Sequence, residues 1–271
     1  MGKVFTWEEL QNGMVPELPA FTEVVSEISS TLKDSPLIGG VICGSVNYGT
    51  HDVRSDIDCL VFYNETDRDD MVARMLKLDQ FAQDRFVPIE FIQLTPELAT
   101  TSMQGISPSM AQHIKCSVER GGLIKADPFD IVKLYELDNR AEAISWTRQR
   151  IRTLDEGAVH IYDAKREAHF LQRLLEAPIH ATRKLLLNSG EFKDDSKLAI
   201  LALTEELFPE LTNPLGRLVT LDITYTELVK SEVRCPSEDN KEYIGNLATI
   251  RDNSESVSRY LKRVGQLLEA R

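Results

Sequence analysis

The order of apolar and polar residues predicts a first half in which strands alternate with helices. Three short apolar runs have the length and the β-branched or aromatic content of strands: 37–43, 57–63 and 85–94. Helical periodicity covers 19–33 and 67–84, and the second of these helices lies between two strands as a crossover. The capping box that begins at Thr6, a further helix ending at Gly121-Gly122 and a short strand at 123–125 complete the predicted elements.

The second half has almost only helical periodicity. Helices are predicted over 139–154, from 162 to 188–190, over 199–208, from Asn213-Pro214 onward, and over a final stretch ending near 268. Pro178 is expected to kink the second of these. Apolar residues of the last helix share one face, which we interpret as bundle core: Val257, Tyr260, Leu261, Val264, Leu267 and Leu268.

Charge divides the chain at the same place as the pattern. Residues 1–130 hold twenty acids and ten bases, whereas 131–271 hold twenty-three acids and twenty-one bases. We therefore predict an α+β protein in which a small mixed sheet with helices (1–130) is followed by an all-α helical bundle domain (131–271), with the boundary near Asp127-Pro128. The net charge of −12 disfavours broad attraction to nucleic acid or to an anionic membrane.

Cysteine spacing and hydropathy give an expectation for the compartment. The four cysteines are far apart, without a CxxC pair, and two of them lie in apolar runs, as is typical of free thiols: Cys43, Cys59, Cys116 and Cys235. The first ten residues lack the apolar stretch of a signal peptide, and no run approaches the roughly 20 apolar residues that span a bilayer. We expect a cytoplasmic protein with no membrane partner.

The segment from Gly44 to Asp58 carries the candidate chemistry. Asp56 and Asp58 stand two apart at a predicted strand start, so their carboxylates point to the same side. Like charges repel there unless a hard cation lies between them, and Mg²⁺ is commonly bound by a few carboxylates together with phosphate oxygens. Gly44-Ser45, directly after a strand, allows a phosphate to approach the backbone closely.

Glu90 is a third candidate, in the middle of an otherwise apolar predicted strand. If the Glu90 carboxylate were buried there without a partner, its charge would destabilise the fold by about several kcal/mol. A second metal ion would compensate it, and two ions about 3.5–4 Å apart can clamp the attacking and leaving oxygens of a displacement at phosphorus. The alternative is an edge-strand charge that prevents aggregation.

These residues resemble the DNA polymerase β-like nucleotidyltransferase superfamily over about 36–94: Gly44-Ser45, Gly49, Ser55-Asp56-Ile57-Asp58 and a later acid. The resemblance implies that Asp56, Asp58 and Glu90 are catalytic and hold two Mg²⁺ ions, and that Gly44, Ser45 and Ser55 contact a nucleoside triphosphate. A sheet domain before a helical bundle also resembles the antibiotic nucleotidyltransferases that modify aminoglycosides. Many of these have a basic residue before the second glycine, where this chain has Tyr48.

The function that these residues predict is transfer of a nucleoside monophosphate from the triphosphate to an acceptor hydroxyl or phosphate, with release of pyrophosphate. The first choice of acceptor is a small, antibiotic-like molecule, since an acidic surface favours a polycation and the helical domain can bind it. A tRNA or protein acceptor is the alternative, and an inactive nucleotide-binding regulatory module is another. The oligomeric state and the preferred base have no signature in the sequence.

Several other charged residues have two interpretations. The basic residues Arg148, Arg150 and Arg152, and the pair Arg183-Lys184, either reach the triphosphate or form a solvated helix face paired with acids such as Asp155 and Glu156, which we favour. Glu136 and Glu142 are candidates for deprotonating the acceptor, without a local motif for either. His51 has no ligand spacing with another histidine, and we assign it no role.

Overall fold

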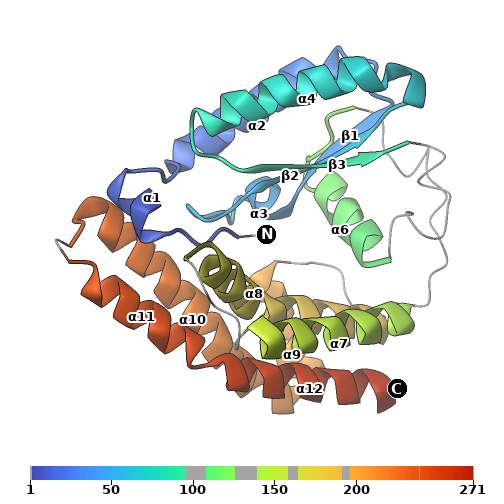
Figure 1. The fold of residues 1–271 in the computed structure, drawn as a ribbon. Helices are drawn as coiled ribbons and strands as arrows, with labels where there is room; N and C mark the ends of the chain where they lie inside the picture. Colours follow the sequence, from blue (N-terminus) through green and yellow to red (C-terminus); the bar gives the residue numbers. More distant parts are fainter. Residues whose placement is uncertain are drawn as a thin grey trace. The chain divides into compact units, whose positions relative to one another are not determined.

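The computed structural model describes residues 2–95, 108–125, 139–157, 164–190, 196–237 and 239–270. Contacts divide the chain into two compact units, Pro16–Leu137 and a second formed by Met1–Val15 together with Asp138–Arg271 (Figure 1). The predicted boundary near Asp127-Pro128 falls outside the described residues. Within the described residues, no helix is both long enough and apolar enough to cross a membrane.

The first unit, Pro16–Leu137, contains a three-stranded mixed sheet, which confirms the predicted α+β class. β1 (Gly39–Cys43) pairs antiparallel with β2 (Ile57–Phe62), and β2 pairs parallel with β3 (Ile89–Leu94). The crossover between the parallel strands is the short 3₁₀ helix η1 (Glu65–Asp67) followed by α4 (Arg68–Gln83). This crossover confirms the helix predicted between the two strands, since strands that pair in parallel need a connection of this kind.

Helices cover both faces of this sheet (Figure 1). On one face, apolar stripes of α2 (Leu18–Lys33) and α4 pack on alternate residues of β2. The α2 stripe of Phe21, Val24, Ile28 and Leu32 is fully buried, because residues spaced by three or four share one face of a helix. On the other face, Leu60 and Phe62 of β2 pack against Ala111 and Ile114 of α6 (Pro108–Glu119).

One predicted strand boundary and one predicted strand are wrong. β3 begins at Ile89 rather than at Arg85, because the end of α4 continues as hydrogen-bonded turns in which the Val87 amide donates to the Ala82 carbonyl and Phe86 has a φ of 58°. The fourth strand is only an isolated antiparallel bridge between Leu123 and Val41.

The second unit is helical in all its described parts apart from connecting loops. Its helices are α1 (Trp7–Gln11), α7 (Asn139–Gly157), α8 (Ala164–Ser189), α9 (Lys197–Leu207), α10 (Pro209–Arg234), α11 (Lys241–Arg251) and α12 (Ser254–Ala270). The apolar face of α12 is buried except for half-buried Leu267, which confirms its interpretation as core. The helix start predicted at Asn213-Pro214 is wrong: α10 begins at Pro209, whose fixed φ suits a first helical position, and it continues through Pro214.

The N-terminal segment is anchored to this helical unit. Thr6 caps α1 through the predicted capping box with Glu9. The backbone amide of Phe5 donates to the Tyr225 hydroxyl over 2.8 Å, and the Tyr243 hydroxyl donates to the Phe5 carbonyl. Both tyrosines are buried, so these bonds satisfy polar groups that would otherwise be costly.

Candidate active site

Three strand ends meet at one edge of the sheet. Because β1 is antiparallel to β2 while β3 is parallel to it, the end of β1 lies beside the beginnings of β2 and β3. In this register Asp58 stands between Cys43 on one side and Glu90 on the other. The two acids therefore occupy neighbouring positions, as their predicted shared role requires.

The pleat places these acids on the α6 side of the sheet. Asp58 alternates with Cys59, so its side chain shares a face with Leu60 and Phe62, which pack against α6. Asp56 stands immediately before the strand. One oxygen from each of Asp56, Asp58 and Glu90 lies within 4.8 Å of the others, with the aspartates half-buried and the glutamate exposed.

Gly44 leaves room for the Asp58 carboxylate. A Cβ at this position would lie 2.8 Å from Asp58 Oδ2, and the residue has a φ of +78°, which side-chain-bearing residues rarely adopt. It begins the short helix α3 (Gly44–Tyr48), which Gly49 caps with a φ of 68°. The sequence therefore has glycine where the backbone passes close to the Asp58 carboxylate. Three carboxylates beside an open backbone form a donor set that suits a hard divalent cation.

The predicted serines join the two loops that border the acids. The Ser45 hydroxyl donates to Ser55 Oγ over 3.1 Å, and Ser55 Oγ also accepts from the Asp52 amide over 3.0 Å. Ser55 is buried, whereas Ser45 is half-buried. The structure thus places Gly44, Ser45 and Ser55 beside the acidic cluster, and their contact with a triphosphate stays a prediction.

Burial, together with the neighbouring Asp58 carboxylate, raises the pKa of Asp56 to about 6. A folded-state pKa above the ordinary value of 3.8 means that the folded protein holds this proton more tightly than the unfolded chain. The stabilisation from protonating Asp56 is complete below about pH 4 and is lost as the pH rises through about 6. Two ionised carboxylates at this position then destabilise the metal-free fold.

We therefore expect Asp56→Asn to raise the melting temperature of the metal-free protein by a few degrees at pH 7, and to change it little at pH 4. Scanning calorimetry in a chelating buffer at both pH values measures this, with exposed Asp34→Asn as the matched control. Added Mg²⁺ at pH 7 should stabilise the wild type more than the variant. Equal effects of the two substitutions at both pH values would contradict the coupling between the acids.

The expectation that Glu90 is buried is wrong. β3 is an edge strand of the described sheet, and Glu90 is exposed. The neighbouring strand residues Ile89 and Phe91 pack on the opposite face, against the core beneath α2 and α4. No second metal is therefore needed to compensate a buried charge, and Glu90 remains a site candidate because of its proximity to Asp56 and Asp58.

Comparison with known families agrees with this arrangement. Residues 25–104 match the model of the nucleotidyltransferase domain family. This part of the chain is a nucleotidyltransferase domain. The protein is accordingly a transferase of phosphorus-containing groups. Searches of curated proteins and of solved structures gave no match.

The matched segment contains the nucleotidyltransferase sheet and all three acids. It includes β1, β2 and β3 with the loop that carries Gly44, Ser45 and Ser55. The predicted superfamily is therefore supported by both sequence and geometry. The likeness to aminoglycoside-modifying enzymes rests only on the order of a sheet domain and a helical region, and it stays a prediction.

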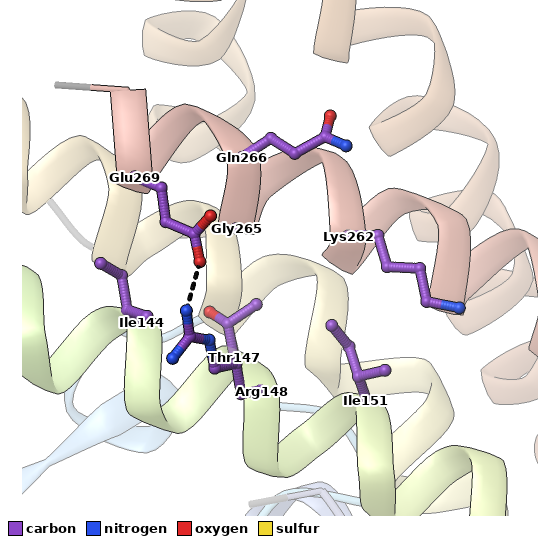
Figure 2. Close-up of a pocket in the computed structure, with 8 residues that line it drawn as sticks. All are labelled: Ile144, Thr147, Arg148, Ile151, Lys262, Gly265, Gln266 and Glu269. Carbon is purple, nitrogen blue, oxygen red and sulfur yellow. Dashed lines mark hydrogen bonds and ion pairs between the residues drawn. The ribbon is translucent and has the colours of Figure 1, made fainter.

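Two of the basic residues singled out in the helical unit, Arg148 and Arg150, contact residues other than Asp155 and Glu156. Arg148 pairs with Glu269 of α12 over 2.6 Å, at a pocket of about 280 Å³ between α7 and α12 (Figure 2). Asp155 instead accepts a hydrogen bond from Ser258. Arg150 lies over the ring of Trp146, with 5.1 Å between the guanidinium carbon and the ring centroid.

Glu142, a candidate base, is held by an ion pair. Its carboxylate lies 2.6 Å from the ammonium group of buried Lys184. Glu136, the other candidate base, lies outside the described residues. His51 packs against Phe21, with 5.0 Å between ring centroids, and it still has no assigned role.

The contribution of α6 to the site was not predicted from the sequence. Its residues Ser117 and His113 contact α3, the first through a 2.9 Å hydrogen bond from Asn47 and the second through the ring of Tyr48. No local motif marks these residues, because they lie far from α3 in the sequence. They reach this site only in the folded protein, where α6 packs on the face of the sheet from which Asp58 and Glu90 project.

Proposed function

We propose that this protein transfers a nucleoside monophosphate from a nucleoside triphosphate to a hydroxyl group of a small-molecule acceptor and releases pyrophosphate. The observation that carries the proposal is the convergence of Asp56, Asp58 and Glu90 within 4.8 Å, beside Gly44, in a nucleotidyltransferase domain. The net charge of −12 supports a cationic acceptor, such as an aminoglycoside-like molecule.

Asp56 and Asp58 would hold the metal ion that binds the nucleotide, and Glu90 would complete the binding site of a second metal ion. Two bound Mg²⁺ ions would supply charge neutralisation at the phosphates and orient the attacking and leaving oxygens. Gly44 would let the triphosphate approach the backbone, with Ser45 and Ser55 as hydroxyl contacts.

In the transfer, the acceptor oxygen forms a bond to the α-phosphorus while the bond from that phosphorus to the α–β bridging oxygen breaks. The bridging oxygen keeps the electron pair and leaves with pyrophosphate. The acceptor proton passes to an adjacent carboxylate, for which exposed Glu90 is accessible to a ligand. Asp56 and Asp58 thus bind the metal of the nucleotide, whereas Glu90 both completes the second metal position and accepts the proton.

The test is incubation of the purified protein with Mg²⁺, each common nucleoside triphosphate and a panel of acceptors that includes aminoglycosides, tRNA and a protein mixture. Pyrophosphate release, together with a mass increase of one nucleoside monophosphate on a small molecule, supports the proposal. A mass increase on tRNA or on a protein would instead show that the acceptor is that macromolecule and not a small molecule. Binding of a triphosphate without turnover on any acceptor would favour the regulatory module.

A further inference from the structure

Tyr48, the last residue of α3, is contacted by two side chains of the α6 region. The guanidinium carbon of Arg120 lies 4.9 Å from the centroid of its ring, and the ring of His113 meets it edge-on at 6.3 Å. His113 and Arg120 are seven residues apart, about two helical turns, so the same side of α6 faces α3. Two groups that can carry positive charge thus converge on this ring.

The backbone fixes the place of Arg120 relative to the start of α3. The Arg120 amide donates to the Ser117 carbonyl, and the Ile42 amide donates to the Gly122 carbonyl over 2.7 Å. A Cβ on Gly122 would clash with the Ile42 carbonyl oxygen, so this turn lies directly against β1. Ile42 precedes Gly44 by two residues, and the end of α6 is therefore tied to the strand that carries the phosphate loop.

The same short helix carries the residues assigned to the triphosphate. Ser45 and Tyr48 are three residues apart on α3, a spacing that places side chains on neighbouring positions of one helix face. A triphosphate that contacts Ser45 would therefore lie about one helical turn from the residues that surround the Tyr48 ring. Arg120 is exposed there, and a guanidinium seated on an aromatic ring keeps its N–H groups at its edge, where phosphate oxygens bind.

Arg54 is a weaker choice for the same role. It belongs to the loop before β2, but only 6% of its side chain is exposed. Arg120 has the exposure that a ligand needs.

We propose that Arg120, seated on the ring of Tyr48, binds the end of the triphosphate that leaves as pyrophosphate. This inference rests on the proposed function and adds a phosphate-binding residue from outside the matched segment. A simpler role for Arg120 is to offset the negative end of the α6 dipole, which affects folding but not ligand binding. The two roles are separated by measuring affinity and stability on the same variants.

The experiment is isothermal titration calorimetry with Mg²⁺-pyrophosphate and with each common Mg²⁺-nucleoside triphosphate. Arg120→Gln should weaken binding of both kinds of probe about ten-fold or more, as expected for loss of a charged hydrogen bond to phosphate. Arg85→Gln is the matched control, because Arg85 also stacks on a ring of the same unit, that of Phe81 at 3.6 Å. It should leave affinity unchanged.

A second pair of variants tests the contact between the Tyr48 ring and the Arg120 guanidinium. Tyr48→Phe retains the ring and should bind both probes like the wild type, whereas Tyr48→Leu removes it and should weaken binding several-fold. Thermal melts of all variants identify any loss of folding. If Arg120→Gln is folded and binds both probes as tightly as the wild type, the role of Arg120 is overturned.

Asp58→Asn separates that failure from failure of the proposed function. If this variant loses triphosphate binding while Arg120→Gln does not, the nucleotide site stands and only the inference about Arg120 fails. If the wild type binds neither pyrophosphate nor any triphosphate, both are overturned.

Discussion

Asp58→Asn is expected to lower turnover by about two orders of magnitude or more, and to weaken Mg²⁺-triphosphate binding, because it removes charge from the centre of the acidic cluster. Asp58 pairs in register with Glu90 and also raises the pKa of Asp56, so it interacts with both other acids. The substitution conserves size and leaves the contact with Gly44 sterically possible. Calorimetry for binding and pyrophosphate release for turnover measure the two effects.

Asp69→Asn is the matched control for this variant, since Asp69 is an exposed aspartate on α4 in the same unit. It should change neither binding nor turnover. Relief of repulsion toward Asp56 should leave the metal-free Asp58→Asn protein at least as stable as the wild type at pH 7. Unchanged triphosphate affinity in a folded Asp58→Asn protein would count against the metal assignment.

Glu90→Gln should separate binding from chemistry. Asp56 and Asp58 remain to hold the metal of the nucleotide, so triphosphate affinity should stay within a few-fold of the wild type. Turnover should fall by about two or more orders of magnitude, as expected when a positioned base or metal ligand is lost. Single-turnover kinetics at saturating nucleotide and acceptor measure this loss directly.

The stability of Glu90→Gln provides a separate check on the structure. Because Glu90 is exposed on an edge strand, the substitution should change the free energy of unfolding of the protein by no more than about 0.5 kcal/mol. Exposed Glu65→Gln serves as the control for both measurements. If Glu90→Gln turns over at the wild-type rate, Glu90 is only an edge-strand charge.

The sequence was sufficient to predict the strands and the acidic cluster because their signals are local. Strand periodicity puts Asp56 and Asp58 on one side, and a parallel β3 with an α4 crossover puts Glu90 next to Asp58. The exposure of Glu90 was not predictable from its apolar neighbours. It depends on which strand lies at the edge of the sheet, a property of the whole topology.

Contacts between distant segments also escaped prediction. Arg120 meets Tyr48 and Arg148 meets Glu269 only because helices pack side by side. A sequence pattern defines the apolar face of a helix but does not identify the partner of an exposed cation. For the same reason the pairing of the Phe5 backbone with Tyr225 and Tyr243 has no signature in the sequence.

The anchoring of the N-terminal segment has a consequence for folding during synthesis. Phe5 and its neighbours are made before the unit Pro16–Leu137, yet they belong with helices α10 and α11, which are made after that unit. The unit that holds the nucleotidyltransferase domain is one continuous stretch, Pro16–Leu137. All the segments that pack together within it are therefore made before the helices of Asp138–Arg271. We therefore expect it to fold first on the nascent chain, while the segment before it waits, with apolar Phe5 and Trp7 unpacked, until Tyr243 has been added.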